Sequence, residues 1–457
     1  MNDNLNKLVI DLGKTNIKFV IINNRKIKFS TSFKTPKSIK KKQLYLDIKL
    51  LWKSILYQLK YISQIFNVHQ ITTVTHGATF VVIKNDKLFY PILDYESEIP
   101  ANIEKEYNDI RENFNNCYSP QLPNGLNVGK QIYFYCKKYK LHNQKNIKII
   151  FFPQFFALLF SGKAVSEKTY LGCHTDLWNP IKNDYSEIVK NYKWEKFFCK
   201  IEPIGCNLGS IRNNLSKLTR LNPNCSILNG GHDSSIAYAA FLSKKNTSPI
   251  LINSGTWTII MSRFTSEKVI DNSLDIYIGT NVLDKPLMVS RFMGGREYKT
   301  IKKMFQNTDS PKLSDLKNII FNDIFCLPSF SSIGGPFKSK KGVILGINKK
   351  SINGSALSSL YVALMTTFYL KRMNDEFVII EGNLTKNSIF CYCLNKLNSE
   401  KQFYIYRKGN TIPHGFLNIL SNFNNNVKLD KLNFNCRKDN LMLDDYYKKW
   451  TSLIENF

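Results

Sequence analysis

A strand–turn–strand pattern that occurs twice is the feature that most constrains the fold of this chain. Residues 8–22 contain two apolar, β-branched runs separated by a turn with Gly13. Residues 249–261 repeat the pattern around a turn with Gly255. Apolar runs on both sides of a short, small-residue turn predict a β-hairpin. Two such hairpins, far apart in the sequence, predict a duplicated architecture.

Helical and strand patterns follow each hairpin. After the first, apolar residues recur at helical spacing over residues 44–66, and residues 71–74 form a short apolar strand. After the second, we expect a helix at residues 357–371, a strand at 377–380 and a helix at 386–397. Strands that alternate with helices in this way indicate an α/β fold.

The length of 457 residues exceeds what one hydrophobic core usually supports, so at least two domains are expected. The polar stretch at residues 243–248 is the least structured junction in the chain. We therefore expect an N-terminal domain at residues 1–244 and a C-terminal domain at residues 245–457, with a cleft between them.

The formal net charge is +29, with 64 Lys and Arg residues against 35 Asp and Glu residues. Of the 64 basic residues, 10 are Arg. Arg dominates bidentate recognition of phosphate and bases, so a Lys excess indicates drift in composition rather than a specific nucleic-acid site. Nucleic-acid binding through this charge stays open as an alternative, which clustering of the Lys residues on one face would favour.

The 10 cysteines show no C-x-x-C spacing, and Cys173, His174, Cys206 and His232 fit no known zinc module. The polar N-terminus lacks the apolar segment of a signal peptide, and no apolar run reaches membrane-spanning length. We therefore expect a cytoplasmic protein with reduced thiols and no membrane association.

The first turn carries groups suited to phosphate and metal binding. Asp11 ends the first strand, and Gly13 lets the backbone approach a ligand closely. The hydroxyl of Thr15 and the turn amides can cradle a phosphate, while Lys18 adds positive charge. The Asp11 carboxylate can hold Mg²⁺ through water, because this ion keeps much of its hydration shell. An ordinary glycine turn would explain the same residues.

The second turn, Ser254-Gly255-Thr256, offers a similar pair of a glycine and a hydroxyl. Taken alone it is also compatible with a plain hairpin turn. Two phosphate-binding turns, one in each domain, would together make a coherent design for phosphoryl transfer.

Asp233 is the candidate general base. It follows Gly230-Gly231, which allow a tight turn, and it precedes a predicted helix with Asp233 or Ser234 as its N-cap. A sugar hydroxyl that attacks phosphorus must lose a proton, and a positioned carboxylate can accept it. The alternative is that Asp233 only caps the helix.

Two further segments contain groups suited to a sugar site. His76 and Gly77 follow a strand, and Trp178 lies in a segment that combines an aromatic ring with polar residues; both segments could equally be structural. The chain has no G-x-x-x-x-G-K-[ST], G-x-G-x-x-G, G-x-S-x-G or H-E-x-x-H motif, so P-loop, Rossmann, α/β-hydrolase and zincin chemistry is not expected.

Taken in their order along the chain, several stretches resemble the FGGY carbohydrate kinases, a family with xylulokinase-, rhamnulokinase- and fuculokinase-like members. These stretches are DLGKTNIK (11–18), THGAT (75–79), GCHTDLWNP (172–180), NGGHDSS (229–235), INSGTW (252–257), GGREY (294–298) and EGNLTKN (381–387). The resemblance implies an α/β fold of two actin-like (ribonuclease H-like) domains. It also implies mixed sheets flanked by helices, with nucleotide and sugar in the interdomain cleft.

The resemblance also implies roles for individual residues. Asp233 would be the catalytic base and would contact the sugar, and Asp11 would serve Mg²⁺. The residues expected to bind ATP are Gly13, Thr15, Asn16 and Lys18 in the first phosphate loop, Gly255 and Thr256 in the second, and Gly382 and Asn383 at the adenosine. The other residues expected to bind the sugar are His76, Gly77, Gln154 and Trp178. The N-terminal domain would thus hold the sugar and the first phosphate loop, and the C-terminal domain the second loop and the adenosine.

Two stretches depart from the family pattern. The adenosine turn of the family commonly has two glycines, and here Asn383 takes the second place. Asn tolerates left-handed backbone better than most residues, so the turn can survive. The family also ends with a helix that contains Gly-Ala-Ala, whereas this chain has the bulkier stretch 412–417.

We therefore expect an ATP- and Mg²⁺-dependent kinase that phosphorylates a terminal hydroxyl of a small sugar, a ketose in the first place. A homodimer is common among such kinases. The alternative from another functional class is a non-catalytic sugar- or nucleotide-sensing protein on the same fold. The joint presence of Asp11, Thr15 and Asp233 argues against a sensor, which needs no general base.

Overall fold

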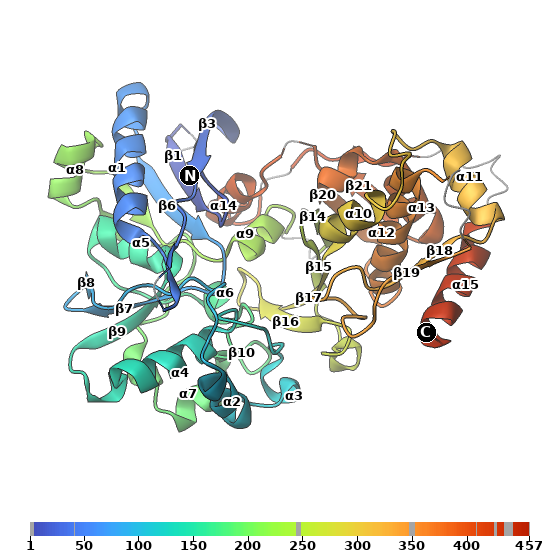
Figure 1. Ribbon diagram of the computed structural model, residues 1–457. Helices are drawn as coiled ribbons and strands as arrows, with labels where there is room; N and C mark the ends of the chain where they lie inside the picture. Colours follow the sequence, from blue (N-terminus) through green and yellow to red (C-terminus); the bar gives the residue numbers. More distant parts are fainter. Residues whose placement is uncertain are drawn as a thin grey trace. The chain divides into compact units, whose positions relative to one another are not determined.

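The computed structural model describes residues 4–40, 42–243, 248–346, 352–407, 409–424, 427–433 and 442–456. The chain forms two compact units (Figure 1). Unit 1 comprises residues Met1–Lys245, Ile278–Leu287 and Asn410–Asn426, and unit 2 comprises Asn246–Tyr277, Met288–Gly409 and Val427–Phe457. Two segments of the second half of the chain, Ile278–Leu287 and Asn410–Asn426, therefore belong to unit 1. A single boundary between residues 244 and 245 would assign both segments to the C-terminal domain. Most of the predicted junction, residues 244–247, lies outside the described residues.

The main sheet of unit 1 has six strands in the order β12-β13-β6-β1-β2-β3. The strands are β1 Lys7–Leu12, β2 Asn16–Asn23, β3 Lys26–Lys34, β6 Gln70–Thr75, β12 Asn207–Ser210 and β13 Ser226–Leu228. The hairpin β1–β2 is antiparallel, whereas β6 pairs with β1 in parallel and extends from Lys7↔Gln70 to Leu12↔Thr75. Strand β1 is buried along its whole length, and this explains its apolar run Leu8–Ile10, which is followed by Asp11.

Helix α1, Ile48–Ile65, packs against unit 1 through Leu51, Ile55, Leu59 and Ile62. The predicted start at residue 44 is wrong. The side chain of Asp47 accepts the N–H of Leu50 at 3.0 Å and caps the helix there, while residues 44–45 pair with residues 39–40 as short strands. Helix α8, Asn213–Thr219, lies beside α1 (Figure 1).

Other strands of unit 1 are β4 Ile39–Lys40, β5 Leu44–Tyr45, β7 Phe80–Lys84, β8 Lys87–Leu88, β9 Ile147–Phe151, β10 Trp178–Asn179 and β11 Asp184–Tyr185. Its other helices are α2 Ala101–Ile110, α3 Phe114–Cys117, α4 Val128–Tyr139, α5 Phe152–Ser161, α6 Lys168–Leu171, α7 Glu187–Asn191, α9 Asp233–Ala239 and α14 Ile412–Leu420. Short 3-10 turns occur at Leu141–Asn143 and Glu195–Phe197.

The second large sheet has seven strands in the order β16-β17-β15-β14-β20-β21-β22. The strands are β14 Ile250–Ser254, β15 Thr258–Arg263, β16 Ile276–Thr280, β17 Pro286–Phe292, β20 Phe377–Gly382, β21 Gln402–Ile405 and β22 Asp430–Lys431. Strand β14 pairs antiparallel with β15 and parallel with β20. This is the arrangement of β1 with β2 and β6, so the predicted repeat of the hairpin is confirmed.

The helices of unit 2 are α10 Gly294–Lys302, α11 Leu313–Phe321, α12 Gly354–Leu370, α13 Ser388–Leu397 and α15 Leu443–Asn456. A two-stranded sheet joins β18 Phe325–Leu327 to β19 Val343–Leu345, and 3-10 turns occur at Glu267–Val269 and Asn383–Lys386. Helix α12 is buried along almost its whole length and lies beside α13 (Figure 1). The predicted helix at 357–371 thus begins three residues earlier, where the side chain of Asn353 accepts the N–H of Ala356.

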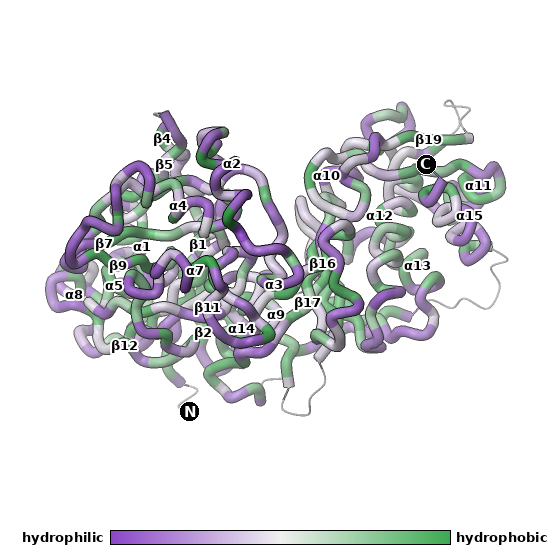
Figure 2. The backbone as a smooth tube through the Cα atoms, turned by 90° about the horizontal axis from the view of Figure 1, so that it is seen from below, coloured by the Kyte–Doolittle hydropathy of each residue, from purple (hydrophilic) through white to green (hydrophobic). Residues whose placement is uncertain are grey.

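Hydrophobic segments lie inside each unit and hydrophilic ones follow its surface (Figure 2). The expected fold class, mixed sheets flanked by helices in two units, is confirmed. Within the described residues, no helix is both long and apolar enough to cross a membrane.

Candidate functional site

The turn between β1 and β2 is closed by backbone hydrogen bonds. The N–H of Gly13 donates to the carbonyl of Asn16 at 3.1 Å, and a β-carbon on Gly13 would lie 2.8 Å from that same oxygen. Thr35 holds the turn from outside, because its N–H donates to the carbonyl of Thr15 and its hydroxyl donates to the carbonyl of Gly13. Glycine is therefore required by space at this position, and Thr15 and Asn16 are left exposed.

Asp11 lies at the end of β1 with its side chain 7% exposed. Its Oδ2 is 3.8 Å from Nζ of Lys18 and accepts a long hydrogen bond of 3.5 Å from the amide of Asn410. Burial raises the pKa of Asp11 to about 6, and the charge of Asp233 adds to this rise, while Lys18 and Asn410 oppose it.

Asp233 is brought to the same part of unit 1 by the strand next to β1. The end of β6 continues into a bridge between Thr75 and His232, and the N–H of Thr75 donates to the carbonyl of Gly231. Helix α9 then begins at Asp233. The prediction that Asp233 or Ser234 caps this helix is wrong, because the N-cap residue is His232 and Asp233 is already helical.

The Asp233 carboxylate is held on one oxygen. Its Oδ1 accepts the N–H of Ser234 at 2.6 Å and the hydroxyl of Ser234 at 3.1 Å, and it lies 3.2 Å from Nε2 of His232. Burial raises the pKa of Asp233, and the charges of nearby His76 and Lys18 counteract this rise. Burial lowers the pKa of His232 to about 3, so this imidazole is neutral at physiological pH. The structure thus brings Asp11, Lys18, His76 and Asp233 together within unit 1.

His76 and Gly77 lie at the end of β6, as predicted. The His76 ring packs against Tyr95, with ring centroids 5.3 Å apart, and against Phe152 at 5.6 Å. Gly77 faces His232, since a β-carbon there would lie 3.3 Å from its Nε2. Sequence reasoning missed Tyr95, because no motif in the sequence marks the loop at residues 94–96.

Gln154 and Trp178 lie in the buried interior of unit 1. The amide of Gln154 donates to Oδ1 of Asn229 at 3.1 Å and to the carbonyl of Gly230 at 3.0 Å, so it supports the loop that precedes Asp233. Trp178 packs edge-on against Tyr185. The structure does not bring Trp178 into the group around Asp233.

In unit 2, the end of β14 is tied to the end of β20. The hydroxyl of Ser254 donates to the carbonyl of Glu381 at 2.6 Å and accepts the N–H of Leu384 at 3.0 Å. These bonds hold the Gly255–Thr256 turn next to the Gly382–Asn383 turn. The two predicted nucleotide-binding segments of this unit are therefore adjacent.

Gly382 adopts φ +88°, and a β-carbon there would overlap the carbonyl oxygen of Ser254. Asn383 is not among the described residues with positive φ; it begins the 3-10 turn that leads to α13. The turn therefore does not use the tolerance of Asn for left-handed backbone, because Gly382 makes the sharp change of direction.

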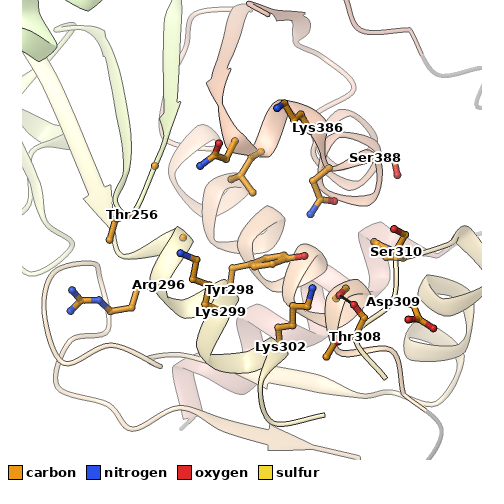
Figure 3. A pocket seen from close by; sticks show the side chains of 17 residues that line it. Thr256, Arg296, Tyr298, Lys299, Lys302, Thr308, Asp309, Ser310, Lys386 and Ser388 are labelled. Carbon is orange, nitrogen blue, oxygen red and sulfur yellow. Dashed lines mark hydrogen bonds between the residues drawn. The ribbon is translucent and has the colours of Figure 1, made fainter. Parts of the chain in front are cut away.

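A cavity of about 810 Å³ opens beside both turns (Figure 3). Its walls include the predicted residues Gly255, Thr256 and Asn383. The glycines that start α10 permit this arrangement, since a β-carbon on Gly295 would overlap the carbonyl oxygen of Gly255. Four basic residues also line the cavity: Arg296, Lys299, Lys302 and Lys386.

The basic side chains of this cavity come from two sides. Figure 3 shows Lys299 and Lys302 projecting from α10 and Lys386 on the segment before α13. Asp309 is the one acid among the described lining residues. Such a cavity is suited to a ligand with several negative charges. Sequence reasoning missed these residues, because Lys is abundant throughout the chain.

Comparison with known proteins adds a sequence and a structural relation. The family model described as "Carbohydrate kinase FGGY, C-terminal domain" matches residues 246–426. No curated protein sequence matches the chain. Among solved structures, a carbohydrate kinase from Novosphingobium aromaticivorans is 25% identical, with a TM-score of 0.87 and 98% of each chain covered.

Two further structures share the fold at lower identity. A gluconate kinase from Lactobacillus acidophilus is 15% identical, with a TM-score of 0.77 over 99% of this chain and 97% of that chain. A ligand-bound xylulose kinase from Lactobacillus acidophilus is 15% identical, with a TM-score of 0.78 over 98% and 97%. These similarities confirm the expected family resemblance and its two-domain, actin-like architecture.

Proposed function

We propose that this chain, which is similar over residues 246–426 to the C-terminal domain of FGGY carbohydrate kinases, transfers a phosphoryl group from ATP to a terminal hydroxyl of a small ketose. Its similarity to carbohydrate kinases in sequence and structure supports a phosphotransferase that acts on a sugar. The choice of a ketose, the use of Mg²⁺ and the roles of single residues are the parts that we add.

The geometry of the Asp233 carboxylate carries the proposal. Its side chain is 30% exposed and its Oδ1 is occupied by Ser234, so Oδ2 is left for a substrate hydroxyl. A general base works best when its pKa is not far below the working pH, and burial shifts the pKa of Asp233 in that direction. Asp233 would accept the proton that the sugar hydroxyl loses as it attacks phosphorus. A protein that only sensed sugar or nucleotide would need no such group.

The residues of unit 1 fit a magnesium ion. The charge of Asp233 raises the pKa of Asp11, and a bound cation would relieve that repulsion. Within the described residues no group of three or more His, Cys, Asp or Glu side chains could hold a metal. Mg²⁺ takes one or two carboxylates and completes its shell with water and phosphate oxygens, so it does not require such a group. Bound there, the ion would neutralise charge on the transferred group, with Asp11 as its protein contact.

The residues of unit 2 fit a nucleotide. The Gly255–Thr256 turn and the Asn383 turn both line the cavity of about 810 Å³, and its basic side chains suit a polyphosphate. Gly255 leaves the backbone open to a close approach, since a β-carbon there would meet nothing nearer than 3.7 Å. We propose that Gly255 and Thr256 bind phosphate, that Gly382 and Asn383 bind adenosine, and that Gly13, Thr15, Asn16 and Lys18 form the other phosphate loop.

A xylulose kinase is among the structures that share the fold, and on that basis we propose a ketose as the acceptor. The position of His76 and Gly77 supports a sugar site in unit 1. The His76 ring, flanked by Tyr95 and Phe152, offers an apolar face near Asp233. Sugars bind well against such faces, because their C–H groups pack on rings while their hydroxyls seek polar partners. The proposal also places the protein in the cytoplasm, where ATP is available.

The test is a panel of pentuloses, hexuloses, deoxyketoses, polyols and sugar acids, offered with ATP and Mg²⁺. Mass spectrometry of the products identifies any sugar phosphate, and thermal shifts with a non-hydrolysable ATP analogue report binding. We expect product from a ketose. If only gluconate or a polyol gives a product, the proposed ketose acceptor is refuted. If no acceptor gives a product, the proposed kinase activity is refuted.

The Asp233→Asn variant tests the role of the base. It should abolish sugar phosphorylation, with a loss on the order of 10³-fold or more in kcat, and it should retain nucleotide binding. Asp86→Asn, at an exposed turn position, is the matched control. Full turnover in Asp233→Asn would exclude Asp233 as the base.

A further inference from the structure

Lys14, in the middle of the first phosphate turn, is paired with carboxylates from a distant loop. Its Nζ lies 2.5 Å from Oδ1 and 2.6 Å from Oδ2 of Asp94, and 3.2 Å from Oε2 of Glu96. A lysine ammonium has three N–H donors. Three carboxylate oxygens thus lie within 3.2 Å of this ammonium group, which is directed toward the loop at residues 94–96.

Asp94 is fixed from several directions. Its side chain is 2% exposed, it accepts the hydroxyl of Ser38, and its Oδ1 accepts the N–H of Glu96 at 3.0 Å. Burial alone would raise the pKa of Asp94, but the hydrogen bonds from Lys14 and Ser38 hold it below its usual value. This carboxylate is thus a charged anchor inside the protein, and Lys14 is its counter-ion.

The same contacts reach the aromatic wall of the proposed sugar site. Nζ of Lys14 lies 4.6 Å from the centre of the Tyr95 ring, and that ring packs edge-on against His76. The loop that carries Asp94, Tyr95 and Glu96 is therefore joined on one side to the phosphate turn and on the other to His76. A cavity of about 500 Å³ is lined by Lys14, His76 and Asp94 together.

We propose that Lys14 is a positioning residue, which ties the first phosphate turn to the loop at residues 94–96 and thereby sets the geometry of phosphate and sugar relative to each other. The inference rests on the proposed function, because it assigns the two sides of this link to ATP and sugar. Lys14 acts through Asp94 and Tyr95 and does not touch phosphate.

Lys18 shows the contrast within the same hairpin. Its side chain is 43% exposed, and its contact with Asp11 is 3.8 Å long. Lys18 therefore keeps donors available for a ligand. A lysine that serves phosphate and a lysine that serves the scaffold thus lie four residues apart.

The experiment is a double-mutant cycle on the full chain with Lys14→Met, Asp94→Asn and both together. Each single variant should lower kcat/KM for the sugar by about 10- to 100-fold, and the double variant should be no more than about threefold worse than either. Both single variants should raise the KM for sugar and lower kcat. If Lys14 bound phosphate instead, Asp94→Asn would release it and tighten ATP binding, whereas Lys14→Met would weaken ATP binding.

Two controls separate positioning from general stability. Lys14→Arg keeps a charged, hydrogen-bonding group for both carboxylates and should restore kcat/KM to within about fivefold of the wild type. Lys190 also pairs with two carboxylates, Asp184 at 2.8 Å and Glu187 at 3.6 Å, and lies outside the proposed site. Lys190→Met should leave kcat and both KM values unchanged, whatever it does to the melting temperature.

The outcomes also distinguish this inference from the proposed function. If the wild type phosphorylates no sugar, the function fails, and binding of sugar and of an ATP analogue by calorimetry still tests Lys14. If the wild type turns over and the cycle is additive, or Lys14→Met acts on ATP affinity alone, the positioning role is refuted. If Lys14→Met does not fold, Asp94→Asn and Lys14→Arg carry the test through their KM and kcat values.

Discussion

Gly415 packs directly against the backbone of Ile236: a β-carbon on Gly415 would overlap the carbonyl oxygen of Ile236. The contact joins α14, near the end of the chain, to α9, whose first residue is Asp233. Asn418 extends the contact, because its amide donates to the carbonyls of Ala239 at 2.8 Å and Leu242 at 2.7 Å. The bulky stretch 412–417 thus contains one glycine, Gly415, at the point where α14 contacts α9.

Replacing Gly415 should therefore damage the site from a distance. We expect Gly415→Ala to lower the free energy of unfolding by about 1–3 kcal/mol, because the added methyl group forces α9 and α14 apart. It should also lower kcat, since Asp233 moves with α9. Urea unfolding and steady-state kinetics measure the two effects. Gly415→Val should be worse than Gly415→Ala, and wild-type stability in either variant would contradict the packing argument.

The adjacent residues Gly382 and Asn383 should respond oppositely to alanine. Gly382→Ala places a β-carbon against Ser254 in a backbone conformation that L-residues rarely adopt, so we expect nucleotide binding to be lost. Asn383→Ala should fold normally and bind nucleotide within about tenfold of the wild type. Calorimetry with an ATP analogue, together with thermal melting, makes the comparison. Equal effects of the two substitutions would show that the turn does not depend on Gly382.

The basic cavity of unit 2 should give nucleotide binding a dependence on salt. Lys299→Ala and Lys302→Ala should each weaken ATP binding about 3- to 10-fold at low ionic strength, and less at high ionic strength where the charges are screened. Lys317→Ala, exposed on α11, is the matched control and should have no effect. Titrations at two salt concentrations test this. A loss that is the same at both would mean that Lys299 and Lys302 act by packing.

Glu167 should make stability depend on pH. Its carboxylate is buried and caps α6, and burial raises its pKa from 4.5 to about 7 although hydrogen bonds from Thr169 and Tyr170 oppose the rise. Between these two values the native state holds a proton that the unfolded state has lost. Stability is therefore greatest below pH 4.5 as far as Glu167 is concerned, and it is lost as the pH rises through about 7.

The Glu167→Gln variant isolates this contribution. The difference in unfolding free energy between wild type and variant should change by on the order of 3 kcal/mol between pH 4.5 and pH 8, in the direction that favours the variant at high pH. Urea unfolding at several pH values provides the measurement. A difference that stays constant with pH would mean that Glu167 ionises normally.

Strands and helices were predicted correctly from the sequence where their apolar residues follow a clear local pattern. Both hairpins and the strand that follows each have an apolar, β-branched pattern, and the α/β fold class followed from them. The family resemblance followed from the order of seven short stretches along the chain. The helix at residues 44–66 was extended too far, because its first apolar residues belong to a short strand and Asp47 decides the start. The roles assigned to Asp11, Asp233 and the two turns stay predictions.

The sequence by itself determined the two hairpins, the strands that follow them and the helices near residues 48–65, 354–370 and 388–397, because side-chain periodicity and glycine placement act over a few residues. The tertiary structure alone decided that Asn410 lies beside Asp11, that Lys14 pairs with Asp94 and that Gly415 fits against Ile236. These partners are distant in sequence, and their meeting depends on how whole elements pack. No local pattern encodes such packing, since many side chains share in its free energy.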